Sequence, residues 1–227
     1  MKPEKTTQEA KKPVHKRYIP AAEVNLAAVL AVVARKWSEN PWLVLRWLTL
    51  ATFTAEVSSF TLLLNQQQKA IATRPQLVRM LKNLEHQMDD SLSYVKGYIS
   101  DKFQKERAKS YYASFGIEHH KNRYSLPIDR EKRLMSLKLL LKALVKNDFE
   151  TKEYGTAFWT PIKENYETLS AQLSHLNGQI SLQSGEKRLL KVNLKKGLNA
   201  LILNIKSNYP DTYKQELRNW GFQKEKY

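Results

Sequence analysis

The sequence contains no cysteine, and its 227 residues include only seven glycines and eight prolines. Without cysteine the chain can form no disulfide, no thiolate metal site and no cysteine nucleophile. This composition suits a reducing compartment, so we expect a cytoplasmic protein. Glycine and proline interrupt helices, and their shortage favours long helices joined by short connections.

Several motifs that indicate an enzyme or a metalloprotein are missing as well. None of the five histidines follows a carboxylate by three residues, which removes the paired Glu-x-x-His motifs of di-iron bundles. The His-Glu-x-x-His zinc motif, the phosphate-binding loop and the Gly-x-Ser-x-Gly elbow are also absent from the sequence. We therefore expect neither a metal ion nor a cofactor.

Two apolar stretches bear on membrane insertion. The run from Leu26 to Ala34 follows a basic amino terminus, but that terminus contains glutamates and is too long for a signal peptide. Residues 41–64 are numerous enough to span a bilayer, but Arg46 and Glu56 would each cost about 2.5–3.5 kcal/mol near its centre. We expect a soluble protein without a membrane span, in which both charges reach water or meet an opposite charge.

Apolar side chains recur at helical spacing along most of the chain, and this pattern predicts an all-α fold. Prolines in favoured first-turn positions mark several helix starts, and glycines mark some of the ends. We expect a bundle of six long helices plus a short C-terminal helix. The expected helices cover approximately residues 20–37, 41–69, 75–115, 129–148, 160–183 and 186–206, with the short helix between residues 210 and 221.

The helix pattern divides the chain into four parts: a flexible basic tail (1–19), a three-helix half (20–117), a linker loop (118–128) and a second three-helix half (129–227). We expect these parts to form one compact domain. The halves are candidates for a pseudo-symmetric repeat, because one alignment of the chain with itself pairs Lys96 with Lys206 and Asp101 with Asp211. Each half also ends in an aromatic-glycine-apolar triplet, F-G-I or W-G-F. Alternatively, two amphipathic helices align whenever their apolar stripes are in phase.

The chain is strongly basic, with a formal net charge of +16 that attracts polyanions. Five basic residues and no acidic one lie between Glu131 and Asp148, and six lie in the same way between Glu186 and Asp211. At helical spacing such residues can line one flank of a helix and neutralise phosphates of DNA or RNA. Alternatively, they form the solvated face of an amphipathic helix. The candidate polyanion-binding residues are Lys138, Lys142, Lys146, Arg188, Lys191 and Lys195.

The stretch between residues 111 and 124 interleaves aromatic and basic side chains, a combination typical of base-stacking platforms. The candidates for a stacking loop are Tyr112, Phe115, Arg123 and Tyr124. Alternatively, aromatic residues at the end of a helix belong to the hydrophobic core.

Arg79 and His86 are separated by six residues, which resembles the Arg-x4–6-His signature of the all-α HEPN ribonucleases. The resemblance covers this one short motif, and Met80 stands where that family usually has a polar residue. It implies a metal-independent ribonuclease in which the imidazole is the general base or acid and the guanidinium stabilises charge on the phosphate. Alternatively, both side chains lie on a solvated helix face.

The sequence thus favours a non-catalytic protein that acts by binding or scaffolding, with an acidic partner such as nucleic acid. A ribonuclease that uses Arg79 and His86 is the alternative. The patterns are compatible with a homo-oligomer.

Overall fold

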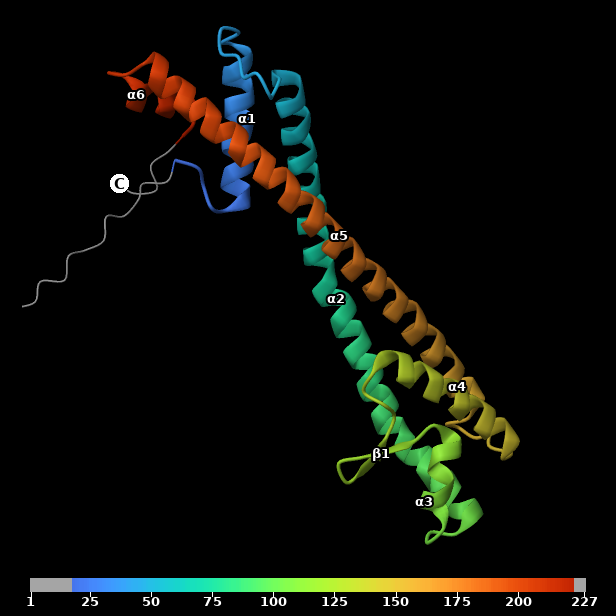
Figure 1. Cartoon of the computed structure of the whole chain (residues 1–227). Helices are drawn as coiled ribbons and strands as arrows, with labels where there is room; N and C mark the ends of the chain where they lie inside the picture. Colours follow the sequence, from blue (N-terminus) through green and yellow to red (C-terminus); the bar gives the residue numbers. More distant parts are fainter. Residues whose placement is uncertain (1–17, 223–227) are drawn as a thin grey trace, which may run out of the picture. The chain divides into compact units, whose positions relative to one another are not determined.

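The structure, a computed structural model, describes residues 18–222, so the predicted flexible tail lies almost entirely outside the described residues. Helices dominate this part of the chain, and the all-α prediction is confirmed (Figure 1). Within these residues, none of the helices combines the length and apolar character that crossing a bilayer requires. In chain order the elements are α1 (Glu23–Ser38), α2 (Leu50–Phe103), α3 (Ala108–Tyr111), the 3-10 helix η1 (Tyr112–Phe115), β1 (Glu118–His120), β2 (Arg123–Ser125), α4 (Arg130–Lys146), α5 (Thr156–Asn208) and α6 (Tyr213–Asn219).

The prediction of six long helices is wrong, because two very long helices take the place of four. α2 has 54 residues and joins the predicted second and third helices, while α5 has 53 residues and joins the fifth and sixth. Pro75 and Pro161, which were predicted to open helices, lie inside them. A proline in a helix interior removes one hydrogen bond, but buried side chains on both sides of each proline hold the helix in place.

α2 begins at Leu50, later than predicted. The Thr49 hydroxyl accepts a hydrogen bond from the Thr52 backbone amide (3.1 Å), as an N-cap residue does. Arg46 therefore lies in the segment before the helix, and its side chain is exposed. The charge of Arg46 thus reaches water, one of the two outcomes expected from the sequence. Glu56 lies inside α2 and is half-buried.

The described residues form two compact units, which we call unit 1 and unit 2. Unit 1 contains residues 18–67 and 183–222, and unit 2 contains residues 68–182. α2 and α5 each contribute residues to both units. The halves expected at 20–117 and 129–227 follow chain order, whereas unit 1 combines residues from both ends of the described chain.

Unit 1 has its core between α1, the first part of α2, the last part of α5 and α6 (Figure 1). The ring centres of Trp37 and Phe53 lie 5.4 Å apart and fix α1 against α2. The amphipathic pattern of α1 places its apolar stripe in this core. The buried side chains of α1 are Leu26, Val29, Leu30, Val33 and Trp37.

Unit 2 has its core between α4, the first part of α5 and the last part of α2, with α3 and η1 packed against them. Its largest fully buried side chains are Trp159 and Tyr166 of α5 and Phe115 of η1. The Asp129 carboxylate caps α4 by accepting a hydrogen bond from the Lys132 amide (3.0 Å).

The predicted linker loop at 118–128 contains a short β-hairpin. β1 and β2 pair antiparallel, with Glu118 opposite Ser125. Lys121 and Asn122 connect the strands with φ angles of 43° and 66°. Two consecutive residues with positive φ are typical of the two-residue turns that match the twist of a hairpin. Strands this short carry no period-2 pattern long enough to stand out in the sequence.

The buried positions of the long helices recur in one register, which we call the repeat register. Several buried residues in the last part of α2 each have a buried counterpart in the last part of α5, always at the same separation along the chain. The shorter helices α1 and α4 correspond in the same way, at a separation that is one position greater. The pairs between α2 and α5 are Leu81 and Lys187, Met88 and Leu194, Leu92 and Leu198, Val95 and Leu201, and Ile99 and Ile205. The pairs between α1 and α4 are Leu26 and Arg133, Val29 and Ser136, Leu30 and Leu137, Val33 and Leu140, and Trp37 and Leu144.

Gly116 and Gly221 end two short helical segments with the same cap. Their φ angles are 72° and 84°, in the left-handed region that favours glycine. Each glycine amide donates to the carbonyl three residues earlier, and the next amide, that of Ile117 or Phe222, donates to the carbonyl five residues earlier. This pair of hydrogen bonds is the Schellman motif. The triplets F-G-I and W-G-F therefore mark the same local structure.

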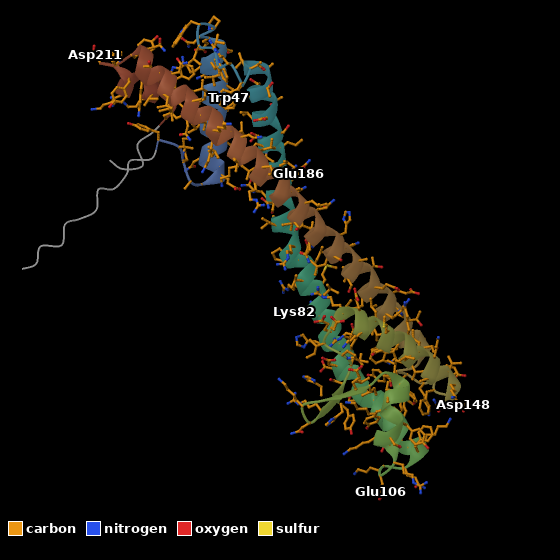
Figure 2. The ribbon with its side chains drawn as sticks, viewed as in Figure 1. Trp47, Lys82, Glu106, Asp148, Glu186 and Asp211 are labelled. Carbon is orange, nitrogen blue, oxygen red and sulfur yellow. The ribbon has the colours of Figure 1, made fainter. Side chains whose placement is uncertain are left out.

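The alignment predicted from the sequence is about one helical turn out of the repeat register. It pairs Asp101, which lies inside α2, with Asp211, which lies beyond the end of α5 (Figure 2). It also pairs Leu84 with Leu194, whereas the buried counterpart of Leu194 is Met88, about one turn further along α2. A slip by one turn keeps the apolar stripes in phase, so matching the sequence alone could not detect it.

Candidate partner-binding face

The predicted polyanion-binding residues of α4 lie in unit 2. Lys138 Nζ lies 3.6 Å from a carboxylate oxygen of Glu167. Lys142 and Lys146 are exposed on the same helix, and neither has an ion-pair partner within residues 18–222. Two of the three α4 lysines therefore carry a charge that no described residue neutralises.

Two of the lysines on α5 belong to an internal ion-pair network in unit 1. Lys191 Nζ lies 2.9 Å from Glu23 Oε1, and Lys187 Nζ lies 2.6 Å from Glu23 Oε2. Lys187 is buried and also donates to Gln67. The hydrogen bond from Lys187 is the main cause that holds the pKa of Glu23 below its usual value, against the opposing effect of burial. Lys191, a predicted polyanion-binding residue, is thus already paired.

A groove of about 660 Å³ opens on unit 1 beside α5. Lys195, Asn199 and Lys206 of α5 line it together with Tyr18 and neighbouring residues of the segment before α1. The Lys206 ammonium lies 4.8 Å from the centre of the Tyr18 ring. No lining residue is acidic, and neither lysine has an ion-pair partner in the described part of the chain. The groove therefore offers two positive charges that no residue between 18 and 222 neutralises.

The segment between α1 and α2 presents a tryptophan beside α5 (Figure 2). Trp37 Nε1 donates a hydrogen bond to the Leu43 carbonyl (2.8 Å), and the side chains of Leu43 and Leu48 are buried. Between these anchors, the centre of the Trp47 ring lies 4.7 Å from Lys196 Nζ, and Trp47 remains 51% exposed. Exposed tryptophans that the surrounding structure holds in place are common in binding surfaces.

One face of α5 lies next to both the groove and Trp47, and we call it the α5 face. At about 100° per residue, its members fall within about 120° of the helix circumference. Three of them are lysines without an ion-pair partner among the described residues, and three are exposed aliphatic residues. The α5 face consists of Leu189, Val192, Lys195, Lys196, Leu203 and Lys206. Arg188, also predicted to bind polyanions, is exposed at its beginning.

Unit 2 carries the opposite charge at the positions that match two of the three lysines of the α5 face. In the repeat register, Lys195 corresponds to Asp89 and Lys196 to Asp90. Asp89 lies 3.8 Å from the buried guanidinium of Arg133. Burial raises the pKa of Asp89, and the positive charge of Arg133 opposes that shift. In this register, Lys195 and Lys196 of the α5 face therefore have acidic counterparts in unit 2.

The predicted stacking loop presents only some of its side chains to solvent. Phe115 is fully buried in the core of unit 2 and is not available to stack on a base, because its ring already packs against other side chains. Tyr112 and Tyr124 are half-buried with ring centres 5.0 Å apart, and Arg123 is exposed on the hairpin. Burial, reinforced by Tyr124, raises the pKa of Tyr112.

Arg79 and His86 both lie on α2 in unit 2, and both are exposed. About two helical turns separate them, so they project from the same side of the helix. A cavity of about 420 Å³ lies along this part of α2, and its lining includes Asn83 and Gln87 but neither Arg79 nor His86. The structure brings the pair to one side of the helix without placing it in that cavity.

Within residues 18–222, no group of three or more His, Cys, Asp or Glu side chains is arranged to hold a metal ion. Comparison of the chain with protein-family models, with curated proteins and with solved structures finds no match. Proposals about its function therefore depend on the geometry of the chain itself.

The sequence predicted Lys195 as a binding residue but missed Trp47, Lys196 and Lys206. Residues 42–47 were assigned to the interior of a helix because they are apolar. Their sequence, W-L-V-L-R-W, is compatible with an extended segment in which alternate side chains face the core, and Leu43 is buried while Trp42 and Val44 are exposed. That alternation is the signal that could have indicated the exposed tryptophans.

Proposed function

We propose that this protein is a non-catalytic binding protein whose unit 1 holds an acidic partner, such as nucleic acid, against the α5 face. The observation that carries the proposal is that Lys195, Lys196 and Lys206 lack ion-pair partners among the described residues, while Lys187 and Lys191 nearby are paired with Glu23. Like charges that lie close together repel each other, so an anion that binds between them relieves an unfavourable interaction. The absence of cysteine supports a cytoplasmic location for this binding.

We also infer that residues 23–117 and 130–222 are two pseudo-symmetric copies of one design. The recurrence of buried positions in the repeat register and the identical caps at Gly116 and Gly221 support this inference. Unit 1 then combines the first part of the first copy with the last part of the second, and unit 2 combines the remaining parts. This exchange covers an apolar face that each copy alone would leave open. The inference predicts that both caps lose stability when glycine is replaced by alanine, which denaturant unfolding can measure.

The repeat provides an internal comparison for the proposed binding face. If lysine merely filled solvated positions, the matching positions of unit 2 should also be basic. Lys195, Lys196 and Lys206 correspond instead to Asp89, Asp90 and Ser100. The contrast favours a role for positive charge on the α5 face over a general excess of surface lysine.

The double variant Lys195→Gln/Lys206→Gln should weaken binding to a single-stranded oligonucleotide. Each lysine that contacts a phosphate contributes about 0.7 to the slope of log K against log salt, so the slope should fall by about 1.4. Fluorescence anisotropy at several salt concentrations measures this slope, and heparin is a second polyanion for the same titration.

Two matched double variants remove the same charge elsewhere. Lys142→Gln/Lys146→Gln alters the other predicted group, on α4, and Lys82→Gln/Lys105→Gln alters exposed lysines outside both groups. We expect the α5 pair to have the largest effect and the Lys82/Lys105 pair to have almost none. Equal effects from all three variants would show that binding follows net charge alone and would refute the proposed site.

The alternative function is the metal-independent ribonuclease, and the observation in its favour is that Arg79 and His86 are both exposed on one side of α2. If the protein only binds its partner, His86 has no catalytic role. The wild type and the His86→Ala variant should then show the same level of RNA cleavage. A fluorescent single-stranded RNA incubated with chelator present measures the activity directly. Cleavage that disappears in His86→Ala but persists in Lys195→Gln/Lys206→Gln would establish the ribonuclease instead.

A further inference from the structure

The α5 face is apolar as well as basic. Leu189, Val192 and Leu203 are 67%, 63% and 67% exposed, and Trp47 stands at the edge of the same face. Single exposed aliphatic residues are ordinary on protein surfaces, but several of them on one helix face, next to a fixed tryptophan, are typical of an interaction site. Phosphate binding alone does not account for these apolar side chains.

The matching positions of unit 2 contain no aliphatic side chain. In the repeat register, Leu189 corresponds to Asn83, Val192 to His86 and Leu203 to Gly97. The matching positions are accessible to solvent in both units, so burial in the core does not explain the difference. Unit 1 therefore carries apolar residues and unit 2 polar residues or glycine at equivalent places of the repeat.

The three aliphatic side chains form a narrow stripe along α5. At about 100° per residue they fall within about 60° of the helix circumference. Lys196 lies in the same arc, and Lys195 and Lys206 follow one edge of it. From Leu189 to Lys206 the face is about 25 Å long. The aliphatic stripe itself, from Leu189 to Leu203, is about 21 Å long. Together with its lysines, the face matches one side of an amphipathic helix of about five turns.

We propose that the partner of the α5 face is an acidic amphipathic helix of another protein. The proposal rests on the proposed function and names the partner of the same site. The apolar side of the partner helix packs on Leu189, Val192 and Leu203 and against Trp47, and its Glu or Asp side chains reach Lys195, Lys196 and Lys206. The three lysines require a partner with negative charge. The aliphatic stripe requires that the apolar residues of the partner recur at helical spacing.

The chemistry of the face favours a helix over a nucleic acid. Single strands bind by stacking bases on aromatic rings, whereas the stripe consists of aliphatic side chains. The Trp47 ring already has the Lys196 ammonium 4.7 Å from its centre, which leaves one side of a single ring free for a base. Exposed aliphatic side chains contribute most to the free energy of binding when an apolar surface of the partner covers them. An amphipathic helix supplies that surface together with flanking carboxylates.

Selection from a display library of helical peptides tests the proposal with the full-length protein as bait. Peptides of about 20 residues are long enough to form helices when bound. The enriched peptides should carry Glu or Asp together with apolar residues at i, i+3, i+4 and i+7 spacing. Synthetic copies of these peptides and sequence-scrambled versions are then titrated against the variants by fluorescence anisotropy.

Two double variants separate the contributions of the apolar and the charged residues. Val192→Ser/Leu203→Ser should weaken binding of the enriched peptide at least about tenfold and leave heparin binding within about twofold of wild type. Lys195→Gln/Lys206→Gln should weaken binding to both ligands. The control Met135→Ser/Leu139→Ser, which alters exposed apolar residues of α4 in unit 2, should change neither affinity.

The outcomes distinguish this proposal from the proposed function. If heparin binds through the lysines but no acidic helical peptide is enriched, the helix proposal fails and the proposed function stands. If neither ligand binds, both fail. Enriched peptides that lack acidic residues, or that bind the Val192→Ser/Leu203→Ser variant as tightly as wild type, overturn the helix proposal. Tight binding of a single-stranded oligonucleotide that Trp47→Ala abolishes and Val192→Ser/Leu203→Ser preserves overturns it in favour of nucleic acid.

Discussion

Replacing Gly116 by alanine should lower the free energy of unfolding by about 3 kcal/mol, because two penalties act together. A non-glycine residue at φ 72° suffers left-handed strain of about 1–2 kcal/mol. The new Cβ would also lie 2.5 Å from the Ser136 carbonyl oxygen and 2.8 Å from its Cα, and these backbone atoms of α4 cannot turn away as a side chain can. Urea unfolding followed by circular dichroism measures the loss.

Two other glycines serve as controls for Gly116. Gly221→Ala has the same backbone strain, but its Cβ would meet only the Val32 side chain at 3.1 Å, so we expect a smaller loss of about 1–2 kcal/mol. Gly97 lies inside α2 with open space around it, and Gly97→Ala should stabilise the protein by about 0.5–1 kcal/mol. If Gly116→Ala and Gly97→Ala unfold at the same urea concentration, the cap described at Gly116 does not exist.

The substitution Glu23→Gln should cost about 3 kcal/mol of stability in unit 1. Lys187 is buried, and Glu23 is its only ion-pair partner among the described residues, so the substitution leaves a positive charge in the core without a counter-ion. Lys187→Met should be nearly neutral, because Glu23 keeps Lys191 at 2.9 Å and an apolar side chain suits the site. In the repeat register the counterpart of Lys187 is Leu81, a buried apolar side chain.

A double-mutant cycle isolates the interaction between Glu23 and Lys187. Glu23→Gln/Lys187→Met should recover most of the stability that Glu23→Gln loses. Glu39→Gln, which breaks an exposed pair with Lys36, should have no resolvable effect. Equal losses in Glu23→Gln and Glu39→Gln would mean that Lys187 reaches water and that the buried pair is not formed.

The same pair makes unit 1 sensitive to acid. The pKa of Glu23 is lowered, mainly by the hydrogen bond from Lys187, so its ionised form is stabilised in the folded protein. The stability that this group contributes is present above its pKa in the unfolded chain and is lost as the pH falls through its lowered folded pKa. The Glu23→Gln/Lys187→Met variant should therefore lose less stability than wild type over that range.

The sequence predicted the all-α class because apolar periodicity depends only on which side chains face the core. It could not predict that α2 and α5 run through Pro75 and Pro161, since a local stop signal was outweighed by burial on both sides of each proline. The predicted alignment of the chain with itself differs by about one turn from the register of the buried positions for a related reason. Helical stripes match in several registers, and the caps and the buried residues are visible only in the folded chain.

The candidate site was predictable to a similar extent. Clusters of lysine on α4 and α5 are visible in the sequence, but the sequence does not reveal that Glu23, near the start of the described chain, pairs with Lys187 and Lys191 of α5. Which lysines stay unpaired is a property of the folded chain. Trp47 was missed because an apolar segment was taken for a helix, whereas its anchoring through Leu43 and Leu48 leaves the indole on the surface.

The division of the chain between the units has a consequence for how the protein can be made. Unit 2 is one continuous stretch, residues 68–182, whereas unit 1 needs residues from both ends of the described chain. A ribosome releases residues 183–222 after residues 18–182, so part of the apolar stripe of α1 stays uncovered until they emerge. Packing of residues 68–182 in the meantime shortens the loop that unit 1 must close and lowers the entropy lost in closing it. The last part of α5 and α6 thus complete the core of unit 1 after unit 2 has packed, and premature termination of synthesis would leave part of the apolar stripe of α1 exposed as a site for chaperones or aggregation.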